Sequence, residues 1–158
     1  MQTQLEIARR FLEQAYQHQL AGALERAVNL YRASLEMHPT AEAHTFLGWA
    51  YSQQGRYEDA IDECMLAIEL DPDYGNAYND IGAYLIALDC HESAIPWLEK
   101  AIAAAHCERR SAAYMNLAHI YQHFGQPFKV LRVLREAWES EAYLPALDGY
   151  HSLLGRLN

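Results

Sequence analysis

The 158-residue chain is poor in basic residues and in long apolar runs, and each shortage excludes a class of partner or location. Twelve Lys and Arg residues stand against 21 Asp and Glu residues, which gives a net charge of −9. The basic residues form no cluster larger than the pairs Arg9-Arg10 and Arg109-Arg110, so nucleic acid and anionic lipid are disfavoured as partners. No apolar run approaches the roughly 20 residues of a membrane helix, so no membrane insertion is expected.

Cysteine is also scarce, and an odd total of three disfavours a disulfide framework. Cys64 falls at an apolar position of a helical pattern and is expected to be a small buried residue. Cys90 and Cys107 lie at opposite ends of a predicted helix, roughly 24 Å apart at ~1.5 Å per residue, which is too far for a bridge. Reduced thiols and a polar segment 1–10 without the apolar stretch of a signal peptide predict a cytoplasmic location.

The common motifs of enzymes are missing as well. The sequence has no glycine-rich phosphate loop, no Gly-x-Ser-x-Gly turn and no Cys-x-x-Cys pair. One alternative stays open, because His119 and His123 lie four residues apart on one helical face and can both reach a metal, with Asp80 as a third ligand. Ile120 stands where a His-Glu-x-x-His motif requires glutamate. Two ligands are too few for a dedicated site, so we predict no enzyme, no metal and no cofactor.

What the sequence does contain is a pattern that returns every 33 to 36 residues, in four copies of which the first is the weakest. The second copy has Leu47, Gly48, Tyr51, Gly55, Ala60, Ala67 and Pro72; the third has Tyr78, Ile81, Gly82, Leu85, Ala94, Leu98 and Ala101; the fourth has Tyr114, Leu117, Ala118, Tyr121, Gly125, Leu134 and Ala137. Apolar residues recur in steps of three and four, which predicts two amphipathic helices per copy, with a glycine turn between them at Gly22, Gly55 and Gly125. These landmarks resemble the tetratricopeptide repeat (TPR) family over nearly the whole chain.

The resemblance implies an all-α fold, a right-handed α-solenoid of antiparallel helix pairs that forms a single domain over residues 1–158. Its repeats are expected at about 8–40, 41–74, 75–108 and 111–142. The spacing predicts helices over 3–20, 24–37, 41–54, 57–70, 75–88, 91–104, 111–124 and 127–141. A last helix over 143–157 is expected to cap the stack through the apolar stripe Leu144, Leu147, Tyr150, Leu153, Leu154 and Leu157.

In this family the first helix of each repeat lines a concave groove that holds a partner peptide, so the resemblance implies that role for the matching face here. Steps of 100° per residue place the candidate groove residues on that face. They are Glu13, Tyr16, Leu20, Phe46, Trp49, Gln53, Asn79, Asp80, Ala83, Asn116, His119 and His123. Phe46 and Trp49 face away from the stack, as binding anchors do, although neighbouring helices that half-bury them are an equal alternative.

The sequence therefore predicts a non-catalytic scaffold or adaptor that binds an apolar, basic segment of another protein along this groove. A self-associating module that forms a homo-oligomer is the alternative, and a metal-dependent protein that uses His119 and His123 is a weaker one. Acidic C-terminal tails, which some TPR domains grip with a clamp of cations, are disfavoured as ligands. On the predicted face Asn116 alone fits such a clamp, and no cation stands beside Glu42 and Asp80.

Overall fold

The computed structural model describes residues 3–157, and within them it contains nine α-helices and no β-strand. The helices are α1 (Gln4–Leu20), α2 (Leu24–Met37), α3 (Ala41–Gln53), α4 (Tyr57–Leu70), α5 (Gly75–Ala87), α6 (His91–Ala103), α7 (Arg110–His123), α8 (Pro127–Glu141) and α9 (Leu144–Leu157). Every predicted helix begins and ends within one residue of the observed one, so the period read from the sequence fixes the elements correctly.

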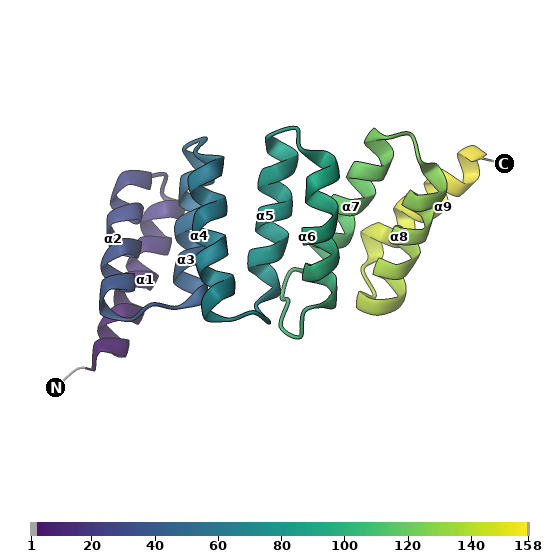
Figure 1. Ribbon diagram of the computed structural model, residues 1–158. Helices are drawn as coiled ribbons and strands as arrows, with labels where there is room; N and C mark the ends of the chain where they lie inside the picture. Colours follow the sequence, from purple (N-terminus) through teal and green to yellow (C-terminus); the bar gives the residue numbers. More distant parts are fainter. Residues whose placement is uncertain (1–2, 158) are drawn as a thin grey trace.

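Consecutive helices pair and stand side by side in one row from the N-terminal to the C-terminal end (Figure 1). The strongest contacts join α1 to α2, α3 to α4, α5 to α6 and α7 to α8. The first helices of neighbouring pairs also touch, α1 with α3, α3 with α5 and α5 with α7, whereas the second helices of the described residues make no comparable contacts with one another. The first helices thus form the tighter inner layer of an all-α solenoid, which confirms the predicted fold class.

Small residues let the two helices of a pair approach closely. A Cβ atom on Gly48 would lie 2.9 Å from the carbonyl oxygen of Ala60, and one on Gly82 would overlap the side chain of Leu98. Ala60 and Leu98 are completely buried. A larger residue at either glycine would force the pair apart, so these crossings set the distance between the layers.

The core consists of two apolar clusters that meet in the third pair. Tyr31, Leu47 and Ile81 belong to the N-terminal cluster, and Leu98 and Ile120 belong to the C-terminal one. Leu85 packs against both clusters. The apolar interior therefore continues along the row without a gap at the middle.

Each pair turns through one residue with a left-handed backbone. Three of these residues are glycines, Gly22, Gly55 and Gly125, with φ between 64° and 79°. The fourth is Asp89, with φ of 62°. Glycine adopts this conformation without steric cost, whereas aspartate does not, so the turn of the third pair differs from the rest.

The linker between α6 and α7 folds back onto the start of α5. Tyr74 and His106 form an isolated parallel bridge. In it the Gly75 amide donates to the His106 carbonyl oxygen at 2.6 Å, and the His106 amide donates to the Asp73 carbonyl oxygen at 3.2 Å. The linker is thus held in place by backbone hydrogen bonds.

Helix α9 packs against α8, but not through the whole stripe predicted for it. Ala146 is fully buried, and Tyr150 and Leu153 pack on the C-terminal cluster. Leu144 is 63% exposed and Leu157 is 42% exposed, so the predicted stripe is wrong at both ends. The contacting face instead runs through the small residue Ala146, which allows α9 to lie close to its neighbour.

The three cysteines are free thiols. Cys64 is completely buried, as predicted, and burial raises its pKa well above the usual value. A thiol that stays protonated and inaccessible is unreactive, so Cys64 serves as an apolar core residue.

Candidate functional site

A hollow of about 780 Å3 opens on the inner layer, between α1, α3, the start of α5 and the end of the α6–α7 linker. We call it the inner groove. Its lining residues are Arg9, Leu12, Glu13, Tyr16, Glu42, Thr45, Phe46, Trp49, Tyr74, Asn76, Asp80, Glu108 and Arg109. The structure therefore brings together five of the predicted groove residues: Glu13, Tyr16, Phe46, Trp49 and Asp80.

Three of those five form an aromatic cluster on one wall. The Tyr16 ring lies 5.5 Å from the Phe46 ring and 6.3 Å from the Trp49 ring, measured between centroids. Phe46 also stacks on the fully buried Tyr31, at 6.1 Å and an interplanar angle of 11°. Phe46 is thus held by the protein core on one side, whereas Tyr16 and Trp49 are half-buried at its edge and present part of their rings to the groove.

A buried polar network forms the floor beside the aromatic wall. The Asn116 side-chain amide donates to Asn79 Oδ1 at 3.2 Å, and the Asn79 amide lies 3.4 Å from Asp80 Oδ1. Asn79 is 1% exposed and Asp80 5%. The prediction that Asn79 lies at the groove edge and offers hydrogen bonds to a partner is wrong, because its amide is buried and already used to join α5 to α7.

The Arg109 guanidinium pairs with the Asp80 carboxylate, and its backbone amide donates to Asn76 Oδ1 at 3.2 Å. Burial raises the pKa of Asp80 from 3.8 to about 6, while the Arg109 charge and the Asn79 bond oppose the rise. The expectation that no cation faces Asp80 is also wrong, since both Arg9 and Arg109 line the groove. Arg109 belongs to the linker, outside the helical face on which that expectation rested.

The remaining predicted residues lie outside the inner groove: Leu20, Gln53, Ala83, Asn116, His119 and His123. Leu20 is 59% exposed at the end of α1. The Gln53 side chain accepts a hydrogen bond from Gln19 at 2.6 Å, so it links α3 to α1. The groove thus covers the first three pairs and stops where the linker crosses it.

Sequence reasoning missed several residues of the groove wall, chiefly Tyr74, Glu108 and Arg109. Tyr74, Glu108 and Arg109 precede helices, where helical periodicity carries no signal.

A second hollow, of about 410 Å3, lies between α7, α8 and α9. Its wall is mostly apolar, with Met115, Val130 and Leu153 among the lining residues, and His119 stands on its rim. His119 therefore lines a different hollow from the inner groove.

The metal alternative drawn from the sequence requires Asp80 as a third ligand to His119 and His123, and the structure contradicts it. Asp80 is occupied by Arg109 in the inner groove. His123 instead meets His91 and Asp89, whose ligand atoms lie within 4.8 Å of one another and of a ring nitrogen of His123. In the described residues the ligand-type side chains therefore converge at the α5–α6 turn, and not on α7 alone.

Comparison with known proteins agrees with this architecture. Residues 12–74 match a family model described as tetratricopeptide repeat. Small glutamine-rich tetratricopeptide repeat-containing protein 2 of Mycosarcoma maydis is 27% identical over 77 residues, which is 48% of this chain and 22% of that protein. The chain thus spans about a fifth of that curated relative.

Two solved structures show the same fold at low identity. Pseudomonas aeruginosa pilF has a TM-score of 0.84 and 19% identity, over 97% of this chain and 70% of that one. YrrB, described as a TPR protein with an unusual peptide-binding site, has a TM-score of 0.65 and 20% identity, over 92% of this chain and 75% of that one.

The row of helix pairs with an inner groove defines a helical repeat protein of the solenoid class. Residues 12–74 match the tetratricopeptide repeat family, and the row of helix pairs as a whole has the fold of a solved TPR protein. Proteins of this family are generally non-catalytic and bind other proteins or peptides. None of the helices in the described residues is both long and apolar enough to cross a membrane.

Proposed function

We propose that the protein is a non-catalytic scaffold or adaptor whose inner groove binds an extended segment of a partner protein. The observation that carries the proposal is the half-buried pair Tyr16 and Trp49, which stands on the groove wall beside charged side chains. Aromatic residues that are partly desolvated by their own fold and partly open are the usual anchors of protein interfaces.

The groove favours a ligand that combines an apolar side chain with a positive charge. The apolar side chain would pack on the faces of Tyr16 and Trp49. Three carboxylates, those of Glu13, Glu42 and Glu108, also line the groove, against the guanidinium of Arg9. Arg109 is neutralised by Asp80. A basic side chain would therefore meet an excess of negative charge, which gives specificity and faster association.

The size of the groove supports a short linear segment. A hollow of about 780 Å3 falls within the range of roughly 300–1,000 Å3 that encloses most of a small ligand, so a few peptide residues fill it. YrrB, which shares the fold, is described as having a peptide-binding site. In this chain the segment would end at the linker, where Arg109 crosses the groove.

The test is to isolate partners by affinity capture, to reduce the bound region to a fluorescent peptide, and to measure its dissociation constant by polarisation. Trp49→Ala should weaken binding roughly thirtyfold, equivalent to about 2 kcal/mol, because it removes one aromatic anchor. Trp97→Ala is the matched control, since Trp97 stacks on Tyr78 from the outer helix α6 and is not among the groove-lining residues.

Equal affinities for the parent and Trp49→Ala would contradict the proposed groove. A dimer that dissociates on dilution in light scattering, and whose formation competes with the peptide, would instead support the homo-oligomer. Thermal unfolding of both variants separates loss of an anchor from loss of the fold.

A further inference from the structure

The turn between α5 and α6 departs from the other three turns at two positions. At its left-handed position the third pair has Asp89, and two residues later, at the start of the second helix, it has His91. The other turns have Gly22, Gly55 and Gly125 at the first position, and Leu24, Tyr57 and Pro127 at the second. The third pair therefore has, in place of a glycine and an apolar residue, two side chains of types that can bind metals.

The first replacement runs against the backbone. Asp89 has a φ of 62°, in a region that glycine enters freely and that other residues enter at a cost. Aspartate tolerates this region better than most side chains, but glycine suits it best, as the other three turns show. A residue that is disfavoured by its own backbone conformation, in an otherwise regular array, is typical of a functional position.

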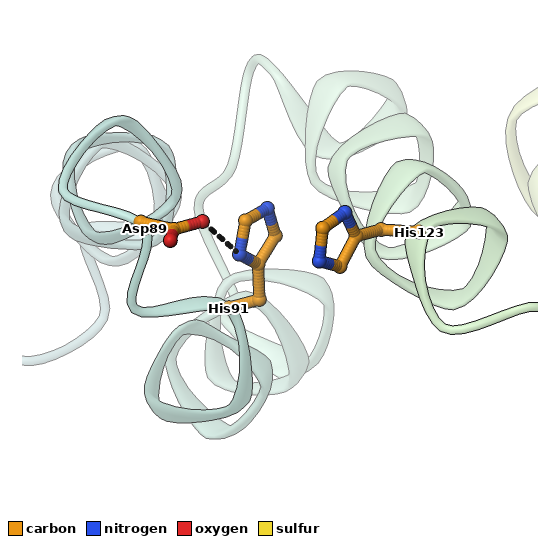
Figure 2. Close-up of side chains that lie close together, drawn as sticks. All are labelled: Asp89, His91 and His123. Carbon is orange, nitrogen blue, oxygen red and sulfur yellow. Dashed lines mark ion pairs between the residues drawn. The ribbon is translucent and has the colours of Figure 1, made fainter.

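The neighbouring pair supplies a third ligand. His123, the last residue of α7, stacks on His91, with ring centroids 4.1 Å apart and an interplanar angle of 1°. On the other side of His91, its Nδ1 atom lies 3.2 Å from Asp89 Oδ1 (Figure 2). The His91 side chain is 11% exposed, whereas Asp89 and His123 are open to solvent. Figure 2 shows the three side chains in one line, from the turn across to α7.

We propose that Asp89, His91 and His123 bind a divalent first-row transition metal of the zinc class, with water in the fourth position. Ligand atoms around a tetrahedral ion lie about 3.4 Å apart, because each is about 2.1 Å from the ion. The existing separation of 3.2 Å between His91 Nδ1 and Asp89 Oδ1 already matches that spacing. All ligand atoms of the cluster lie within 4.8 Å of one another, so no separation has to shorten by more than about 1.4 Å.

The movement that closes the site falls on His123. An imidazole nitrogen binds a metal in the plane of its ring, so two parallel stacked rings cannot both hold one ion. His91 is packed, but His123 is exposed at the end of its helix and can turn its ring edge towards the site. Turning an exposed side chain takes only a rotamer change and no movement of the backbone.

The surroundings suit a cation. The small hollow around the cluster is lined by Asp89, Cys90, His91, Glu92, Ser93, His123 and Phe124, and no Lys or Arg is among these described residues. Two imidazoles and a carboxylate suit zinc, cobalt, nickel and copper, whereas magnesium and calcium prefer oxygen ligands throughout. Since the ligands come from two neighbouring pairs, the ion would fix the third pair against the fourth.

The test uses the full-length, untagged chain after treatment with a chelator, titrated with ZnCl2 by calorimetry and with CoCl2 by visible absorption. We expect one ion per chain, the intense visible bands of a tetrahedral cobalt site, and a rise in Tm of about 5 °C or more in excess zinc. His91→Ala and His123→Ala should each lose affinity by at least about tenfold. His119→Ala, which leaves the three ligands in place, is the matched control and should stay within about twofold of the parent.

Asp89→Gly is the sharpest variant, because the proposal gives it two opposite effects. Glycine suits the left-handed backbone, so the metal-free variant should melt at or above the parent. It should also lose at least about tenfold in zinc affinity and most of the zinc-induced rise in Tm. This combination separates a lost ligand from a damaged fold.

Three results would overturn the proposal. One is a parent chain that binds no zinc, and another is zinc affinity that is unchanged in His91→Ala. The third is a loss in His119→Ala as large as that in His123→Ala, since it would place the ion on the two histidines of α7 alone.

Discussion

The inner faces of the second and third repeats use the same position for opposite chemistry. Phe46 on α3 and Asp80 on α5 stand one repeat apart at matching places of the first helix. Phe46 is surrounded by aromatic rings, whereas Asp80 is buried in a network of amides and one guanidinium. The repeat fixes where a side chain lies, but its neighbours decide whether that place is apolar or charged.

The largest expected effect comes from giving the second repeat the chemistry of the third. Phe46→Asp removes the stacking on Tyr31 and leaves a carboxylate without a matching arginine. We expect a loss of about 3–5 kcal/mol in the free energy of unfolding, measured by urea denaturation. Phe46→Leu is the control and should lose much less. A loss below about 1 kcal/mol for Phe46→Asp would show that the surroundings of position 46 accept a carboxylate as readily as those of Asp80 do.

The next effect comes from removing the charge that supports Asp80. Arg109→Ala should destabilise the fold by about 2 kcal/mol at pH 8, because a buried carboxylate then lacks its ion pair. The loss should shrink as the pH falls towards about 6, because without the Arg109 charge the pKa of Asp80 rises further and the variant takes up its proton at a higher pH than the parent. Arg9→Ala, which alters the other arginine of the groove, should have little effect at either pH. A loss of stability in Arg109→Ala that does not change with pH would show that the Arg109 charge does not act on the Asp80 carboxylate.

Asp80→Asn tests the same network with a smaller effect of opposite sign. The pKa of Asp80 is higher in the folded chain, at about 6, than its ordinary 3.8, so the folded state binds the proton more tightly. The parent therefore gains stability as the pH falls through 6 towards 4, relative to a variant that cannot ionise there. At pH 7.5 Asp80→Asn should be more stable by about 1 kcal/mol, and the difference should vanish near pH 4.

The smallest effect concerns the amide that joins the third and fourth repeats. Asn116→Ala removes the donor to Asn79 Oδ1 and should cost about 1 kcal/mol. Gln122→Ala, at an exposed position of the same helix, is the control. Equal melting temperatures for the parent and Asn116→Ala would show that the network is held by Arg109 alone.

The fold was predictable because its signals are local and repeated. Three of the four copies mark their turn with a glycine, such as Gly55 in the second repeat, and Gly48 marks the close crossing of that repeat. Helix ends are therefore correct to within one residue. The last helix was less well predicted, since no second copy exists to show that Ala146, and not Leu144, carries the contact.

For the candidate site, the sequence predicted which face of a helix a side chain lies on, but not how deeply that side chain is buried. Angular counting placed Tyr16, Phe46 and Trp49 on the inner face, and the structure brings them together. The same counting placed Asn79 there but gave no hint that α7 covers it. The burial of a side chain depends on the angle between neighbouring repeats, and helical periodicity carries no information on that angle.

The residues that come from turns and linkers were out of reach for the same reason. Arg109 enters the groove because the linker is bonded to the start of α5. His91 meets His123 because two repeats pack side by side, although the sequence separates them by a whole helix pair. A pattern read along one helix finds His119 and His123 as neighbours and misses the closer partner.

The bridge between Tyr74 and His106 bears on how far this chain is modular. Repeats of a solenoid normally touch only through their helices, so whole copies are lost, gained or exchanged with little disturbance. Here the loop that leaves the third repeat is joined by backbone hydrogen bonds to the segment that enters it. The two ends of the third repeat are therefore joined to each other by these bonds. An exchange of repeats that keeps the bonds has to move residues 73–106 as one unit, and a boundary placed inside that range separates Tyr74 from His106.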